Sequence, residues 1–277
     1  MPLVRDVVGA CDTGQIRGLS LQIIAVMNTL VTNVLVNFDD LNVDVNGDQI
    51  NPFVQPAAKE SLRLAINKRG TKLVVNSAFR TVAQQYLLRR QFELGLCGIF
   101  AAARPGFSNH EGGLALDIQD PQGWRPFLEQ HSWYWLGAFD PPHFDYQFRA
   151  ASRQDLGIVG VKAFQRLWNQ NNPTDQIAED GIYGAQTGAR IANSPAEGFG
   201  AAPIRTLGLA EPRMEGDDVK ALQEALNNNQ LVEINIPVNG IFDPATAEAV
   251  KQFQEATQLL AVDGIVGAMT RRRLGLD

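Results

Sequence analysis

Cysteine, histidine and long runs of one character are all scarce in this sequence of 277 residues. With only two cysteines, Cys11 and Cys97, the chain can build neither a zinc knuckle nor a CxxC redox centre, so these are either two buried thiols or one disulfide. The longest apolar stretch, 19–38, is interrupted by glutamine, asparagine and threonine. It is too polar and too short to cross a bilayer, and we expect a buried helix there.

Positive charge is also limited, since the net charge is -6 and no basic run is longer than 271–273. Little is left to neutralise a phosphate backbone, which argues against a nucleic-acid partner. Residues 1–10 contain no apolar signal core, so export takes another route or a leader precedes this chain. What the chain does have is 45% hydrophobic residues and a two-domain length, which exclude disorder, collagen and coiled coil.

Three stretches in the second half of the chain share one pattern, V-K-x-(F/L)-Q followed by (D/N)-G-I-(F/Y/V)-(G/D)-x-x-T. Each copy predicts an amphipathic helix, a tight turn with glycine at positive φ, and a new helix near the threonine. The copies begin at Val161, Val219 and Val250.

The second and third copies abut, and together they resemble the peptidoglycan-binding domain type 1. This resemblance implies an all-α wall-binding module over 207–277, although the apolar positions of the repeat are structural on their own. The first copy is a half-unit with a longer middle that bridges the domains. We therefore expect a peptidase-type domain over 1–150, the half-repeat with an Ala, Gly and Pro-rich linker (193–206) over 151–206, and the module after it.

The first 150 residues contain the reactive side chains. Helical spacing predicts a helix over 56–69, followed by a strand over 72–75 and a loop over 76–80. Thr81 and Gln84 have capping-box spacing, so a helix should run from there to about Glu93. Arg80 then lies just outside a helix N-terminus, where it suits a carboxylate. Taken alone, Arg80 is more often a solvated surface charge.

Two histidines and two aspartates follow in a suggestive order. Gly112 and Gly113 turn the chain. Large apolar residues then alternate over 114–118 and bury one face of a strand, which leaves Ala115 and Asp117 on the other face. His110 can return across that turn to meet Asp117. The two prolines after Asp140 favour a polyproline-like backbone with about three residues per turn, which places Asp140 and His143 on the same side. Two histidines and one aspartate suffice for catalytic Zn²⁺, with Asp140 as general base and acid. Chance pairing of His and Asp remains the alternative.

The whole pattern Ser108-x-His110-x-x-Gly113-x-Ala115-x-Asp117 with Asp140-x-x-His143 resembles the M15 zinc peptidases. These include D-alanyl-D-alanine carboxypeptidases of the VanY type and L-alanyl-D-glutamate endolysins. The resemblance covers about 55–146 and implies His110, Asp117 and His143 as ligands of one Zn²⁺ and Asp140 as the catalytic acid/base. It also implies that Arg80, Ser108 and Gln85 contact substrate, with Arg80 acting on the reacting group as well.

Several neighbouring residues allow alternatives. Many members of the M15 family have Glu at the position of Asp140. Because the aspartate side chain is shorter, the zinc-bound water must lie about one methylene closer to it. Asp145 is either a partner of His143 or a surface aspartate. The aromatic residues Trp124, Trp133, Tyr134 and Trp135 are expected to pack the core, with wall-glycan stacking as the alternative, and His131 is expected to be structural.

We therefore expect an α+β zinc domain with an antiparallel sheet, followed by helical repeats, in a monomer at the cell envelope, either periplasmic or extracellular. The expected partner is bacterial peptidoglycan, without nucleic acid or a membrane span. The expected activity is D-Ala-D-Ala carboxypeptidase. The alternatives are an L-Ala-D-Glu endopeptidase and a catalytically silent wall-binding protein.

Overall fold

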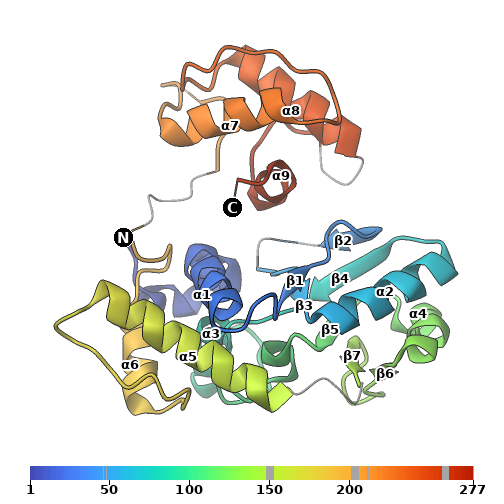
Figure 1. Cartoon of the computed structure of the whole chain (residues 1–277), viewed down its shortest axis with the longest axis vertical. Coiled ribbons are helices and arrows are strands. Elements are labelled where there is room, and N and C mark those ends of the chain that lie inside the picture. The colour runs from blue at the N-terminus through green and yellow to red at the C-terminus, as the bar shows by residue number, and fades with distance from the viewer. Residues whose placement is uncertain are drawn as a thin grey trace. The chain divides into compact units, whose positions relative to one another are not determined.

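The computed structural model describes residues 1–45, 47, 49–147, 153–200, 206–210, 212–257 and 262–276. The chain divides into two compact units, Met1–Ala202 and Pro203–Asp277 (Figure 1). The first unit combines helices with a small sheet, and the second is helical, which confirms the expected fold class. Within the described ranges, no helix has the length and apolar character needed to span a membrane.

A five-stranded sheet organises the first unit, in the order β2-β4-β5-β7-β6. Its strands are β2 (Val43–Val45), β4 (Leu73–Ser77), β5 (Ala115–Ile118), β6 (Trp133–Trp135) and β7 (His143–Tyr146). The pairs β4–β5, β5–β7 and β7–β6 are antiparallel as expected, whereas β2 and β4 run parallel. A separate antiparallel pair is formed by β1 (Val36–Asn37) and β3 (Phe53–Val54).

One hydrophobic core lies between the sheet and the helices α2 (Pro56–Arg69) and α4 (Pro121–Leu128), the latter followed by the 3-10 turn η4 (Glu129–His131). The predicted helix over 56–69 is confirmed, because Pro56 opens it and Gly70, at φ +70, ends it. Trp124 and Trp133 are buried in this core, which confirms their packing role. Tyr134, in contrast, is 45% exposed.

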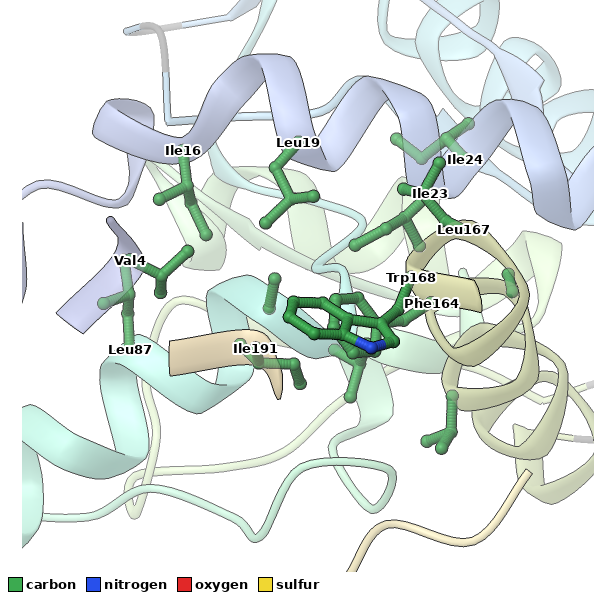
Figure 2. Packing of buried hydrophobic residues seen from close by; sticks show 14 of the residues in the cluster. Val4, Ile16, Leu19, Ile23, Ile24, Leu87, Phe164, Leu167, Trp168 and Ile191 are labelled. Carbon is green, nitrogen blue, oxygen red and sulfur yellow. The ribbon is translucent and has the colours of Figure 1, made fainter. Parts of the chain in front are cut away.

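A second core joins the start of the chain to the first repeat. It involves the 3-10 turns η1 (Val4–Ala10) and η2 (Thr13–Ile16) and the helices α1 (Arg17–Leu30), α3 (Val82–Glu93), α5 (Arg153–Asn171) and α6 (Ala185–Asn193). Figure 2 shows Leu19 and Ile23 of α1 facing Phe164 and Trp168 of α5. The half-repeat therefore lies in the same compact unit as the sheet.

The helix expected over 19–38 is wrong in its last part, because α1 ends at Leu30. The side chain of Asn28 makes the turn: its Oδ1 accepts from Leu35 N at 3.0 Å and its Nδ2 donates to Leu35 O at 3.1 Å. A side chain that bonds a backbone seven residues ahead competes with helix continuation. Asn33 completes the reversal at φ +54.

The two cysteines form one disulfide, Cys11–Cys97, which resolves the two alternatives left by the sequence. Cys11 follows η1, and Cys97 lies just after α3. The bond therefore ties the N-terminal turn to the loop that leaves α3.

The second unit consists of α7 (Asp217–Asn228), α8 (Pro244–Thr257) and α9 (Ala268–Leu274) around a core of its own. Val219, Leu222, Phe242, Val250 and Val266 are fully buried in it.

Each repeat copy is built around one buried glutamine: Gln165, Gln223 or Gln254. The Oε1 atom of each accepts a 2.9 Å bond from the glycine N–H of its turn. Each Nε2 donates to the isoleucine carbonyl, the threonine hydroxyl, and the aspartate or asparagine side chain of that turn. The turn glycines have φ of +73, +75 and +73, which confirms the predicted left-handed turn.

Candidate metal and substrate site

The candidate ligands come from one 3-10 turn and two neighbouring strands of the sheet. His110 lies in the 3-10 turn η3 (Asn109–Gly112), and Asp117 and His143 are register partners across β5 and β7. Gly113 ends the turn at φ +63, where an added Cβ would lie 2.7 Å from Leu35 Cδ2. Glycine takes this conformation without strain, so it favours the turn that brings His110 back to the strand.

One ligand atom from each of His110, Asp117 and His143 lies within 4.8 Å of the other two. His110 Nε2 is 3.4 Å from Asp117 Oδ2, and His143 Nδ1 is 3.0 Å from Asp117 Oδ1. Both imidazoles are buried, and Asp117 is only partly exposed. Two imidazole nitrogens and one carboxylate oxygen are a donor set that zinc accepts.

The second nitrogen of each histidine has a partner that fixes the ring. His110 Nδ1 donates to Ala78 O at 2.7 Å, which turns Nε2 towards Asp117. His143 Nε2 donates to Asp145 Oδ1 at 3.0 Å, so Nδ1 faces Asp117. Asp145 is therefore a partner of His143, which resolves the alternatives left by the sequence.

Asp145 is itself held by Asn109, whose Nδ2 lies 2.9 Å from each carboxylate oxygen. The sequence analysis did not single out Asn109. It also missed Glu111, which accepts from Ser108 N at 2.9 Å and Gly106 N at 2.8 Å and so shapes the approach to η3. The capping-box spacing of Ser108 and Glu111 is the signal that could have found this carboxylate.

The surrounding charges set the protonation states of the cluster in the metal-free protein. Burial alone would raise the pKa of Asp117, but His110, His143 and Arg80 together hold it well below its usual range. Burial and the nearby Arg80 lower the pKa of His110. Burial lowers the pKa of His143, but hydrogen bonds to Asp117 and Asp145 outweigh this and raise it to about 9. An ionised Asp117 and a neutral His110 are the forms that coordinate a metal.

Arg80 and Asp140 border the cluster. Arg80 Nη2 lies 3.3 Å from Asp117 Oδ2 and 3.1 Å from Ser77 Oγ. The predicted capping box of Thr81 and Gln84 is confirmed, and it begins α3 directly after Arg80. Asp140 Oδ2 lies 3.9 Å from His143 Nδ1, and its side chain is 44% exposed and so open to solvent.

A pocket of about 530 Å³ opens beside Arg80 and is also lined by Gln85 and Ser108. Gln85 Nε2 donates to Ala103 O at 2.9 Å, while its buried Oε1 has no hydrogen-bond partner within the described part of the chain. The structure thus brings together the three residues predicted to contact substrate. The remaining walls are mainly apolar, from α3 and the segment 99–103, and no sequence motif had indicated that segment.

The comparisons with known proteins fit this geometry. Residues 49–162 match the family model described as D-alanyl-D-alanine carboxypeptidase. This segment is VanY-like. Residues 215–274 match the model of a putative peptidoglycan binding domain, and no curated protein and no solved structure matches the chain.

Both resemblances proposed from the motifs are confirmed by these matches. A VanY-like segment followed by a peptidoglycan-binding domain supports a cell-wall peptidase with peptidoglycan as its partner and a location at the cell wall. The first repeat copy lies almost entirely outside the two matched segments.

Proposed function

We propose that this protein is a zinc-dependent hydrolase of peptidoglycan stem peptides that binds one Zn²⁺ per chain and removes the terminal D-Ala as a D,D-carboxypeptidase. The observation that carries the proposal is the convergence of His110, Asp117 and His143 beside Arg80. A silent wall-binding protein would have no need of this donor set together with Asp140.

The residues present fit a zinc ion. It would be held by Nε2 of His110, a carboxylate oxygen of Asp117 and Nδ1 of His143, with Ala78 O and Asp145 orienting the two rings. A Zn²⁺ ion at this position would supply Lewis acidity to the scissile carbonyl.

Asp140 and Arg80 would carry out the remaining steps. Asp140 would accept a proton from the attacking water at its carboxylate, and the water oxygen would bond to the carbonyl carbon. When the C–N bond breaks, Asp140 would return that proton to the leaving amine. Arg80 would hold the substrate carboxylate beyond the scissile bond, and burial of its guanidinium strengthens such a contact.

The size of the pocket supports a second candidate, the L-Ala-D-Glu endopeptidase. A volume of about 530 Å³ lies within the usual range for whole small ligands, so it has room for more than one alanine residue. The α-carboxylate of an isoglutamyl residue also lies one residue beyond such a cut, so Arg80 serves either reaction.

The C-terminal unit would hold the enzyme on the wall. The Cys11–Cys97 disulfide supports a place in the oxidising cell envelope, since such bonds persist outside the cytosol. We propose a monomer, because the candidate ligands all come from one chain.

The test is to incubate the zinc-loaded protein with pentapeptide muropeptides and to measure the product masses. Loss of one alanine is expected, whereas a released peptide that begins with D-Glu would favour the endopeptidase. Asp140→Asn should keep its zinc and lose about 10²- to 10⁴-fold in turnover, because the amide lacks basicity. A zinc-loaded wild type that gives no product at all contradicts the proposed function.

A further inference from the structure

A second cavity, of about 410 Å³, lies in the first unit between α3 and the end of the first repeat. Its walls include Tyr86, Arg90 and Glu93 of α3, Arg104, and Tyr183 from the repeat turn. It shares no lining residue with the pocket beside Arg80. Neither the metal cluster nor the repeat core accounts for it.

The three repeat copies show how this cavity arises. The motif position of Tyr183 is filled by Phe242 in the second copy and Val266 in the third, and both of these side chains are fully buried in the core of their unit. Tyr183 is only partly buried and lines the cavity instead. In the first copy this position therefore packs at the edge of the core and also lines a cavity.

The next helix carries small residues on the face that lines the cavity. Gly188, Ala189 and Ala192 of α6 line the cavity. The second copy carries Ala247, Glu248 and Lys251 at these places, and the third carries Arg271, Arg272 and Gly275. A Cβ on Gly188 would lie 2.9 Å from the hydroxyl of Tyr183, so glycine gives this ring its place.

The cavity presents polar groups that are not used by the fold. The structure gives the hydroxyls of Tyr86 and Tyr183 no hydrogen bond, and the guanidinium of Arg104 no ion pair, to any described residue. Burial, together with Tyr86 and Glu93, raises the pKa of Tyr183 to about 12, and a tyrosine hydroxyl is protonated at neutral pH at its ordinary pKa as well.

The one carboxylate of the cavity is already neutralised. Glu93 lies 2.8 Å from Arg89 Nε and 2.6 Å from Arg90 Nη1. The available groups are thus hydrogen-bond donors and positive charge. This combination disfavours a cationic ligand and suits a carboxylate next to a surface on which tyrosine rings can pack.

We propose that the cavity between α3 and α6 is a second binding site for a carboxylate-bearing sugar–peptide unit of peptidoglycan, separate from the site of cleavage. The ligand class rests on the proposed function, because the wall supplies both the carboxylates and the sugar rings. Arg104 and the two tyrosine hydroxyls would bind the carboxylate. A strand held here raises the effective concentration of stem peptides near the metal cluster.

The test uses the full-length protein labelled with ¹⁵N and carrying Asp140→Asn, titrated with disaccharide-pentapeptide. Amide resonances of Gly184 and Gly188 should shift. Ala189→Trp, which fills the cavity from an exposed position, should weaken the binding measured at these resonances at least 10-fold. Gln186→Trp, exposed on the same helix but not lining the cavity, is the matched control and should bind as the parent does.

Separate titrations with the stem peptide and with the disaccharide identify the part of the ligand that is recognised. Binding that needs the peptide carboxylates, and that Arg104→Ala weakens, supports the proposal. Equal binding of the disaccharide alone, or muropeptide binding that leaves Gly184 and Gly188 unshifted, overturns it. Hydrolysis of a short soluble peptide is measured in parallel with Asp140 intact, so a failure of catalysis is scored apart from a failure of this site.

Discussion

The metal cluster and the repeat glutamines are two ways of burying polar side chains, and they differ in what their polar atoms face. Gln223 makes five hydrogen bonds within its own turn, so neither of its polar atoms has capacity left for a ligand. In the cluster, His110 Nε2, His143 Nδ1 and the Asp117 oxygens instead point towards one another, and each histidine's other nitrogen is already bonded elsewhere.

The difference separates structural from functional polar groups. A buried group whose partners are all backbone or turn atoms stabilises the fold, whereas two imidazoles and a carboxylate whose ligand atoms converge form a donor set that could hold a metal ion. Gln85 shows the same contrast within one residue type, because it lines the pocket beside Arg80 and its buried Oε1 has no hydrogen-bond partner in the described chain.

The largest expected effect on zinc content and hydrolysis comes from removing one of the candidate metal ligands. His110→Ala should bind less than about a tenth of the wild-type zinc and lose at least about 10³-fold in peptide hydrolysis, because two protein ligands hold the ion poorly. Zinc is measured by mass spectrometry of the purified protein. His131→Ala is the matched control, since His131 lies in η4 outside the cluster, and equal zinc in the two variants would refute the ligand assignment.

Removing the buried glutamine from a repeat in each unit tests its structural role. Gln223→Ala and Gln165→Ala each leave several buried polar groups of a turn without a hydrogen-bond partner. Each should lower the free energy of unfolding of its unit by on the order of 3 kcal/mol. The second unit, Pro203–Asp277, is much smaller than the first, Met1–Ala202, so its melting temperature should fall about twice as far.

Differential scanning calorimetry of the full chain measures both transitions. Gln223→Ala should leave hydrolysis of soluble peptides unchanged below its melting range. A shift of the other unit's transition instead would mean that the two units do not unfold separately.

A smaller effect on zinc affinity is expected from replacing Asp145, the carboxylate that contacts His143. Asp145→Asn weakens the acceptor that orients the ring, and zinc affinity should fall about 10- to 100-fold. Competition with a chelator measures this affinity, and the absorption spectrum of the cobalt-substituted protein reports the change in ligand field. Asp120→Asn, which removes a salt bridge with Arg69 in the same unit, should lower stability without changing metal affinity, and a similar affinity loss there would point to a general structural effect.

Local sequence determined the parts of this protein whose partners lie a few residues away. Helix α2 was predicted from the helical spacing of its apolar residues, and α3 from the capping box that satisfies its own end groups. The turns of the repeats follow from a glycine at positive φ, and the order of Ser108, His110, Asp117, Asp140 and His143 was enough to suggest the metal chemistry.

Tertiary structure alone decided what depends on segments far apart in the chain. It paired Cys11 with Cys97, placed the first repeat against α1, and set β2 parallel to β4. It also put Asn109 behind Asp145 and opened a cavity where Tyr183 meets Tyr86. The physical reason is that a side chain's spacing in the sequence limits only its near neighbours, whereas its distant partners are set by how whole helices and strands pack.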